Sequence, residues 1–210
     1  MTGKISFLEE LTARLEYLLP GQQAQFKMAP FERVLKSRVP ENFVPKQSAT
    51  LTLFYLIEEK PHFTLILRNS YKGVHSAQIG FPGGKKEETD VDLRATALRE
   101  TEEEIGVNKN SIQVIGKLSE VYIPPSGFLV SPYVGYIDKY PHFNPDSREV
   151  QRIIEVSVED LLNENCVSEK EVFVNAIGNS MRYPCFDFKG EIVWGATAMM
   201  LSELKEILKR

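Results

Sequence analysis

Short apolar segments bounded by turn residues recur along the chain, and they predict a β-sheet. Residues 49–57 (ATLTLFYLI) and 63–68 (FTLILR) are rich in β-branched and aromatic side chains and are separated by the turn-like sequence EEKPH. We therefore expect a hairpin that is buried on at least one face. Further strands are expected at residues 78–81, 112–118, 128–137, 150–156, 171–174 and 181–188.

Apolar residues spaced three and four apart predict helices near both ends of the chain, at residues 1–20 and 197–208, and a short helix is expected at 158–163. The buried side of the first helix is expected to hold Leu8, Leu11, Leu15 and Leu18. The buried side of the last is expected to hold Met200, Leu201, Leu204 and Leu208. Strands and helices mixed without regular βαβ alternation favour an α+β sandwich around a mixed sheet.

The chain of 210 residues is long enough for one domain with a substantial core. Residues 1–48 are expected to form an N-terminal helix and a mostly irregular arm, because the arm carries Pro30, Pro40 and Pro45 and shows no clear hydrophobic period. Residues 49–210 form the main domain. Docking of the first helix on its own domain is favoured over contact with a second copy, although a homodimer stays open.

Composition and charge exclude several classes of function. The 25 basic and 29 acidic residues give a net charge of −4, which argues against nucleic acid as the main partner. The two cysteines, Cys166 and Cys185, show neither metal-site spacing nor a disulfide framework. No signal peptide and no apolar segment near 18 residues is visible, so we expect a cytoplasmic protein without a membrane partner.

The chemistry concentrates in a helix expected at residues 92–105, which Asp90 or Asp92 caps and Gly106 ends. Because residues three and four apart share a helix face, Glu100, Glu103 and Glu104 should project together, with Arg99 at their edge. Like charges at this spacing repel one another, and a divalent cation would reverse that effect.

A solvated acidic face is the ordinary interpretation of such a helix. The preceding sequence Phe81-Pro82-Gly83-Gly84 weakens that interpretation, because two glycines let backbone amides and carbonyls approach a ligand without a Cβ in the way. A glycine turn, a polar loop and an acidic helix in this order favour a site for a metal ion and its ligand.

These residues resemble the Nudix box, G-x5-E-x7-R-E-U-x-E-E-x-G-U, in which U is a bulky apolar residue. Asp90 stands where the pattern has Glu, eight residues rather than seven separate it from Arg99, and Thr101 takes an apolar position. The one-residue insertion is similar to that of the coenzyme A pyrophosphatase branch. The matching positions are Gly84, Asp90, Arg99, Glu100, Glu103, Glu104, Gly106 and Val107.

The resemblance implies an α/β/α sandwich and metal-assisted hydrolysis of a diphosphate. Mg²⁺ or Mn²⁺ would be held by Glu100, Glu103 and Glu104, with the Gly83 carbonyl as a further ligand. Either Glu100 or Glu103 would position the attacking water, and Arg99 would orient a glutamate through a charge-assisted hydrogen bond.

Residues 68–84 (RNSYKGVHSAQIGFPGG) resemble the segment that marks the coenzyme A pyrophosphatase branch. Asn69, Gly73 and Ala77 depart from that pattern, and the arginine missing at Gly73 removes a phosphate ligand that Lys72 could replace only as a point charge. On this resemblance, the substrate-binding residues are Arg68, Lys72, His75, Gln78 and Phe81. A surface or capping histidine at 75 and a surface ion pair at Arg68 are the ordinary alternatives.

Residues 183–198 are similar to the closing segment of the same branch, although Trp194 is most simply explained as a core residue. The resemblance covers most of residues 50–205. It implies a small nucleotide-type substrate, coenzyme A or its thioester, cleaved to a 4′-phosphopantetheine derivative and adenosine 3′,5′-bisphosphate. ADP-ribose or a dinucleotide is the alternative within the family. A protein that only binds a nucleotide is the alternative of another class, and the intact acidic pairs argue against it.

Overall fold

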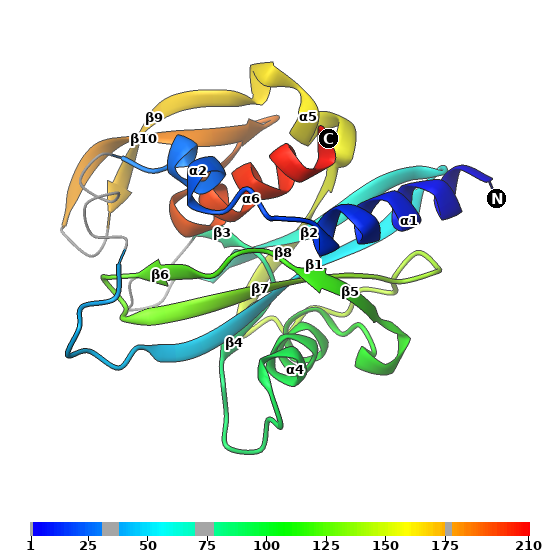
Figure 1. The fold of residues 1–210 in the computed structure, drawn as a ribbon, viewed down its shortest axis with the longest axis horizontal. Coiled ribbons are helices and arrows are strands. Elements are labelled where there is room, and N and C mark those ends of the chain that lie inside the picture. Colours follow the sequence, from blue (N-terminus) through cyan, green and yellow to red (C-terminus); the bar gives the residue numbers. More distant parts are fainter. Residues whose placement is uncertain (1, 31–37, 70–77, 175–177) are drawn as a thin grey trace.

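The structure, a computed structural model, describes residues 2–30, 38–69, 78–174 and 178–210. A large mixed sheet separates helix α4 (Leu93–Ile105) on one face from helices α1 (Thr2–Glu16) and α6 (Gly195–Leu208) on the other (Figure 1). A second, smaller sheet lies beyond α6. The predicted α+β sandwich around a mixed sheet is therefore confirmed. Among the residues described, no helix is long and apolar enough to cross a membrane.

The large sheet has eight strands, and its main order is β3-β2-β1-β7-β5. Strand β1 runs parallel to β7, whereas the other pairs are antiparallel, which makes the sheet mixed. The remaining strands extend it, since β4 pairs with β1, β6 with β7 and β8 with β2. The strands are β1 (Lys46–Ile57), β2 (Lys60–Arg68), β3 (Ile79–Gly80), β4 (Gly83–Lys85), β5 (Gln113–Lys117), β6 (Val121–Ile123), β7 (Phe128–Tyr136) and β8 (Val150–Ser157).

The predicted hairpin is present as β1 and β2, and its turn is shorter than expected. Glu58 and Glu59 make the turn with φ of 49° and 64°, the positive values that a tight two-residue hairpin turn requires. The two strands pair only near this turn, at residues 54–57 and 60–63, and then part. Beyond that point β3 pairs with β2 and β4 pairs with β1, so residues 79–85 pass between the parted strands.

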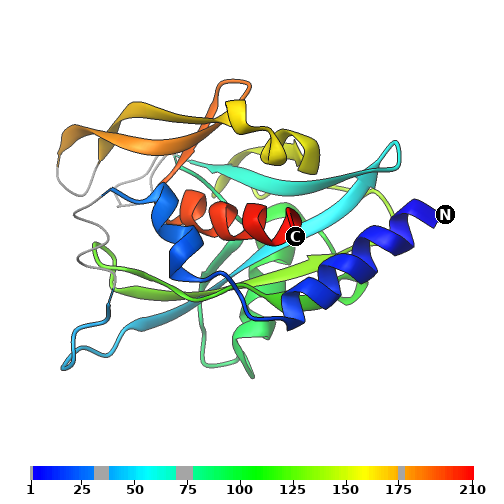
Figure 2. The same ribbon diagram turned by 45° about the horizontal axis from the view of Figure 1, so that its top comes forward.

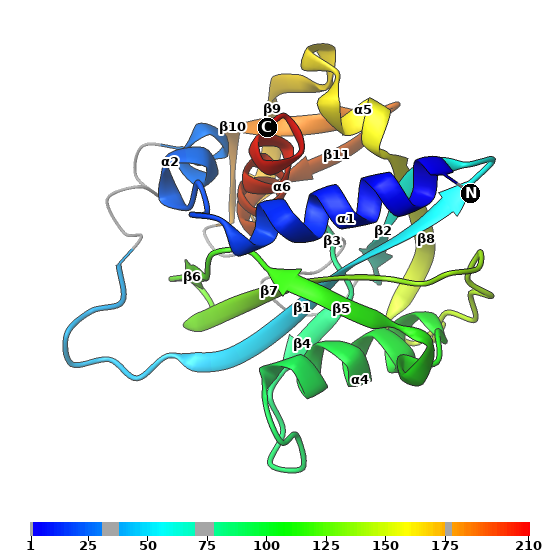
Figure 3. The same cartoon turned by 45° about the vertical axis from the view of Figure 1, so that its right-hand side comes forward.

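Alternating side chains of β1 build a core on each face of the large sheet. Leu51 and Leu53 face α4 and pack with Ala97 and Ile105. On the opposite face a larger core joins α1, α6 and the sheet, and it contains Leu11, Leu15, Phe54, Phe63, Met200, Leu201 and Leu204. The first helix thus docks on its own chain, as the sequence favours (Figure 3).

One leucine of the first helix was predicted wrongly. The helix ends at Glu16, and Leu18 lies beyond it with 88% of its surface exposed. The chain turns instead through Pro20 and Gly21, where Gly21 has a φ of 57°. A proline also disfavours helical conformation in the residue before it, which helps to end the helix early.

The arm after α1 is more ordered than its sequence predicts. It contains α2 (Gln22–Gln25) and the 3-10 turn η1 (Phe26–Met28), and α2 packs against α6. Gln25 is buried and donates to Glu203 of α6 at 2.8 Å, and Glu203 also accepts from the backbone of Gly21 and Ser119. Polar contacts to a buried carboxylate hold this segment, which explains why it shows no hydrophobic period.

The smaller sheet has the antiparallel order β11-β10-β9 and lies across α6 from the large sheet (Figure 2). Strands β9 (Val167–Val174) and β10 (Asn179–Phe188) contain the two predicted C-terminal strands, and β11 (Glu191–Trp194) leads directly into α6. The short helices η2 (Lys109–Ser111), α5 (Val158–Leu162) and η3 (Glu164–Cys166) complete the described elements.

Candidate active site

Helix α4 begins and ends where its capping residues predict. The Asp92 side chain caps the N-terminus by accepting from the backbone N–H of Ala95 at 2.7 Å. Gly106 ends the helix in the left-handed conformation, with φ of 74°. A Cβ there would also lie 2.6 Å from the Asn144 carbonyl oxygen, so this position requires glycine. The two caps fix which residues of α4 face the sheet.

Glu104 is buried against the glycine turn and is held from both sides. One carboxylate oxygen accepts the Gly83 backbone N–H at 2.8 Å, and the other accepts Nη1 of Arg68 at 2.6 Å. The second guanidinium nitrogen, Nη2 of Arg68, donates to the Gly83 carbonyl oxygen at 2.8 Å. Only 2% of the Glu104 side chain is exposed. Arg68, Glu104 and Gly83 therefore form one closed set of contacts between β2, α4 and β4.

Neighbouring groups approach both glycines of the turn closely. Gly83 has a φ of 151°, and a Cβ there would lie 2.3 Å from the Ala49 carbonyl oxygen. A Cβ on Gly84 would lie 2.5 Å from the Glu100 carboxylate. The groups that approach the two glycines are the backbone of β1 and the side chain of Glu100, and the predicted approach of a ligand to this turn stays a prediction.

Arg99 joins three carboxylates on the exposed side of the turn. Its Nε and Nη2 both donate to Asp90 at 2.9 Å, a bidentate pair, and its Nη1 donates to Glu100 and Glu103 at 2.9 Å each. Nη2 also reaches the Lys85 carbonyl oxygen at 3.1 Å. Asp90 is not the helix cap. It lies in the loop before the cap and connects that loop to Arg99.

Burial and ion pairing shift the pKa values of these groups in opposite directions. Burial raises the pKa of Glu104 to about 7, although the Arg68 charge and the Gly83 N–H oppose the shift. Burial also raises the pKa of Glu100, against the effect of Arg99. The hydrogen bonds from Arg99 hold the pKa of Asp90 well below its usual range. Asp90, Glu100 and Glu104 thus lie in different electrostatic environments.

The predicted carboxylates do not converge on one point. Glu100 and Glu103 bond to Arg99, Glu104 bonds to Arg68, and Glu103 is 58% exposed. Within residues 2–30, 38–69, 78–174 and 178–210, no three acidic, histidine or cysteine side chains are grouped to hold a metal ion. Glu104 turns inward to the Gly83 N–H, whereas Glu100 and Glu103 turn to Arg99, so the predicted set of three metal ligands stays a prediction.

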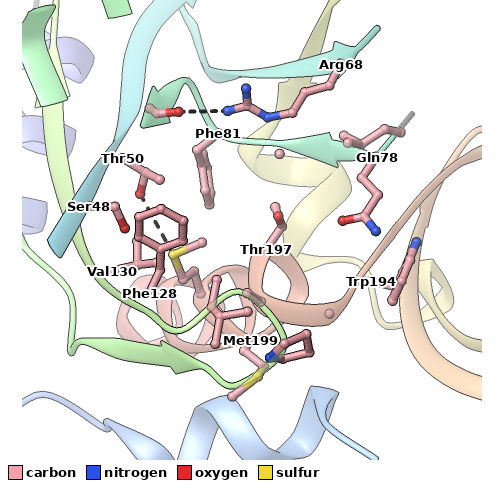
Figure 4. Close-up of a pocket in the computed structure, with 18 of the residues that line it drawn as sticks. Ser48, Thr50, Arg68, Gln78, Phe81, Phe128, Val130, Trp194, Thr197 and Met199 are labelled. Carbon is pink, nitrogen blue, oxygen red and sulfur yellow. Dashed lines mark hydrogen bonds between the residues drawn. The ribbon is translucent and has the colours of Figure 1, made fainter. Parts of the chain in front are cut away.

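A cavity of about 290 Å³ opens beside the glycine turn on the face of the sheet that carries α6 (Figure 4). Gly83, Gly84 and Arg68 line one side of it, and Arg68 thus touches both the cavity and Glu104. The other walls come from β1, β3, β7, the first two turns of α6 and the small sheet. Labelled residues of these walls in Figure 4 include Phe81, Phe128, Trp194, Thr197 and Met199.

Three of the five residues predicted to bind substrate, Arg68, Gln78 and Phe81, line this cavity. Lys72 and His75 lie outside the described residues, as do Gly73 and Ala77. Trp194 is only partly buried and lines the cavity with its ring 5.0 Å from that of Tyr183, so the interpretation of Trp194 as core is wrong.

Sequence reasoning missed most of the apolar lining. Phe128 and Val130 of β7 and Met199 and Met200 of α6 carry no local signal that separates a cavity wall from a core. Thr50 of β1 also lines the cavity, on the opposite face from Leu51. The alternation of β1 predicts two faces, but only the folded arrangement shows that one of them borders a cavity.

Comparison with known proteins agrees with this arrangement. The family model of the NUDIX domain matches residues 46–176, which is more than half of the chain. The chain belongs to the Nudix family of pyrophosphohydrolases. It is 30% identical over 158 residues to the Nudix hydrolase NudL of Photorhabdus laumondii, covering 75% of this chain and 83% of that protein. It is 28% identical over 172 residues to NudL of an Enterobacter species, covering 82% and 88%.

Solved structures of Nudix proteins share the fold. A MutT/nudix family protein from Enterococcus faecalis aligns with a TM-score of 0.53 at 13% identity, covering 93% of this chain and 76% of that one. The Nudix hydrolase RenU from M. smegmatis aligns with a TM-score of 0.50 at 14% identity, covering 82% and 93%. The likeness extends over most of the chain, beyond the segment that the NUDIX model matches.

Nudix hydrolases use divalent metal ions, and the donor set at the glycine turn fits such an ion. Carboxylate and carbonyl oxygens are the ligands that hard divalent ions prefer. The Gly83 carbonyl and the Glu104 carboxylate already share one cation, the Arg68 guanidinium. Gly84, without a Cβ, leaves the Glu100 carboxylate next to the same turn. Oxygen ligands of the right kind are thus held beside the cavity.

Proposed function

We propose that this Nudix hydrolase cleaves coenzyme A or an acyl-coenzyme A to a 4′-phosphopantetheine derivative and adenosine 3′,5′-bisphosphate. The observation that carries the proposal is the position of the 290 Å³ cavity, which shares Gly83, Gly84 and Arg68 with the acidic helix. A diphosphate at the turn would direct one of its two substituents into that cavity. The resemblance of residues 68–84 and 183–198 to the coenzyme A branch adds support.

The lining of the cavity suits the apolar part of such a substrate. Phe81, Phe128 and the partly buried Trp194 offer aromatic surface, and Gln78 and Thr197 provide polar groups at separate points. A mostly apolar pocket with a few polar groups is typical of small-molecule sites. This lining would bind a pantetheine arm, its acyl group or an adenine ring.

In the proposed mechanism the residues of the turn and of α4 hold the metal ion, orient the carboxylates and activate the attacking water. Glu100, Glu103, Glu104 and the Gly83 carbonyl would hold Mg²⁺ or Mn²⁺. When bound, such ions neutralise phosphate charge and lower the pKa of a coordinated water. Glu100 or Glu103 would accept the proton of the attacking water, and both remain candidates.

Arg99 and Arg68 have different proposed tasks. Arg99 holds Glu100 and Glu103 in place through Nη1 while Asp90 fixes the guanidinium, so we assign it an orienting role. Arg68 lines the cavity at the turn, where its guanidinium would meet a substrate phosphate. Gln78 and Phe81 line the same cavity. Lys72 and His75, in the segment between, stay in the proposal on the sequence resemblance alone.

Product analysis tests the proposal. The pure protein is incubated with coenzyme A, acetyl-coenzyme A, ADP-ribose and diadenosine polyphosphates, each with Mg²⁺, with Mn²⁺ and with a chelator. We expect metal-dependent release of adenosine 3′,5′-bisphosphate from the coenzyme A samples. Turnover of ADP-ribose or dinucleotides alone would refute the substrate assignment, and absence of metal-dependent turnover would refute the catalytic one. Glu103→Gln should abolish most turnover without unfolding the protein, as judged by circular dichroism.

A further inference from the structure

Arg68 bridges a carboxylate oxygen and a carbonyl oxygen at the glycine turn. Its guanidinium donates to the Glu104 carboxylate at 2.6 Å and to the Gly83 carbonyl at 2.8 Å. These two oxygens are also proposed as metal ligands. The positive charge on Arg68 thus neutralises a carboxylate that is only 2% exposed, which is a costly group to leave unpaired.

Arg68 lies at the end of a strand and next to the cavity. Arg68 ends β2, and the pairing of β2 with β8 shifts register between Leu67 and Arg68. The Arg68 side chain is 21% exposed and lines the cavity, so free space lies next to its guanidinium (Figure 4). Glu104 has no such freedom, because its second oxygen is bonded to the Gly83 N–H. Of the two partners, only Arg68 has room to leave.

We propose that Arg68 is the counter-ion of Glu104 in the absence of metal, bonded to Glu104 and to the Gly83 carbonyl, and that it releases both oxygens when a divalent ion binds. Its guanidinium then turns into the cavity, toward the position proposed for the substrate phosphates. Arg68 is in this sense a positioning residue for the metal ligands. The inference rests on the proposed metal-dependent function and adds a competition between an arginine and the metal for the same two oxygens.

Metal affinity measures this competition directly. Mn²⁺ binding without substrate is followed by electron paramagnetic resonance for the wild type and for Arg68→Gln, which removes the charge and the fork. We expect Arg68→Gln to bind Mn²⁺ about tenfold more tightly or better, because the ion no longer displaces two charge-assisted hydrogen bonds. Arg68→Lys, which keeps the charge but not the fork, should lie between the two. Arg152→Gln, which breaks an exposed pair with Glu191, is the matched control and should leave the affinity unchanged.

Thermal unfolding provides a second measurement on the same proteins. Without metal, Arg68→Gln should unfold at a lower temperature than the wild type, because Glu104 loses its counter-cation. Saturating Mn²⁺ should then raise the unfolding temperature of Arg68→Gln more than that of the wild type, since a ligand stabilises in proportion to the logarithm of its affinity. In a Glu104→Gln background, the Arg68 substitution should change Mn²⁺ affinity less, because only the Gly83 carbonyl then remains as an oxygen for which Arg68 and the ion compete.

If Arg68→Gln does not fold, the wild type still tests the proposal by NMR. The side-chain Nε–Hε signal of Arg68, assigned with Arg68→Lys, should shift on addition of Mg²⁺ and exchange faster with solvent. An unchanged Arg68 signal at saturating Mg²⁺, or unchanged or weaker Mn²⁺ binding by Arg68→Gln, would overturn the inference. A wild type that binds no metal at all would overturn the proposed function instead, so the two failures are distinguishable.

Discussion

The Asp90–Arg99 pair should be the main electrostatic support of the acidic helix, and Asp90→Asn tests it. Asp90 is 6% exposed and accepts four hydrogen bonds, from Glu87 N–H, Thr96 Oγ1, Arg99 Nε and Arg99 Nη2, all at 2.9 Å. Asparagine keeps the shape but removes the charge and places an NH2 group among these donors. We expect the folded state of Asp90→Asn to be less stable than wild type.

The loss of stability in Asp90→Asn depends on which hydrogen-bond partners Arg99 retains. Removing one member of a buried ion pair costs about 3–5 kcal/mol when the other charge is left unpaired. Arg99 retains Glu100 and Glu103 as partners, so the cost should fall to about 1.5–3 kcal/mol, the range of hydrogen bonds to charged groups. Urea unfolding at pH 7 measures this loss in the free energy of unfolding. Asp146→Asn is the matched control, because Asp146 makes a bidentate pair with the 86% exposed Arg148 and exposed ion pairs contribute little to stability.

The pH dependence gives an independent check on the same pair. Because the pKa of Asp90 is lower in the folded than in the unfolded state, its contribution is fully present above the unfolded pKa, about 3.9, and is lost as pH falls toward the folded value. The stability difference between wild type and Asp90→Asn should therefore be constant from pH 7 to about pH 5 and shrink below pH 4. A difference no larger than that of the Asp146→Asn control, or one that grows on acidification, would refute the reasoning.

Three further substitutions test other parts of the structure. Gly84→Ala should lower kcat at least tenfold in product assays, because its Cβ displaces the end of the Glu100 side chain. Little stability should be lost, since no backbone atom has to move. An unchanged kcat contradicts the placement of Glu100. Glu203→Gln should lower the free energy of unfolding by about 2 kcal/mol, as measured with urea. The reason is that an NH2 group replaces an oxygen that accepts N–H donors, among them the Gln25 amide. A change under about 0.5 kcal/mol would show that these contacts are dispensable. Trp194→Ala should raise KM for the proposed substrate, coenzyme A, several-fold at similar kcat, and an unchanged KM argues against cavity binding.

Local signals in the sequence predicted the parts of the fold that depend on neighbouring residues. Asp92 and Gly106 mark the ends of α4 because a cap is made within one turn of the helix. The apolar segments of β1 and β2 predicted a hairpin because the two strands are joined by a short turn. Family membership followed from the same local spacing of glycine, arginine and glutamate.

Contacts between distant residues could not be predicted in this way. The two-residue strand β3 and the three-residue strand β4 exist only because β1 and β2 part and leave edges to pair with. Glu103 and Glu104 are adjacent and identical in type, and only the position of the Gly83 N–H makes one of them buried and the other exposed. The separate three-stranded sheet likewise depends on how residues 167–194 pack against α6.

The parting of β1 and β2 connects the two halves of the site. The acidic helix lies on one face of the large sheet, and the apolar cavity lies on the other, next to α6. Residues 79–85 pass through the opening between the strands, so Gly83 and Gly84 contact glutamates of α4 and also line the cavity. Arg68, at the end of β2, reaches Glu104 on one side and lines the cavity on the other. A substrate whose diphosphate lies at this opening would be cleaved by residues of α4 and selected by residues of β7, α6 and the small sheet. Substitutions in the cavity should therefore change which compounds are hydrolysed while leaving the metal-dependent chemistry intact.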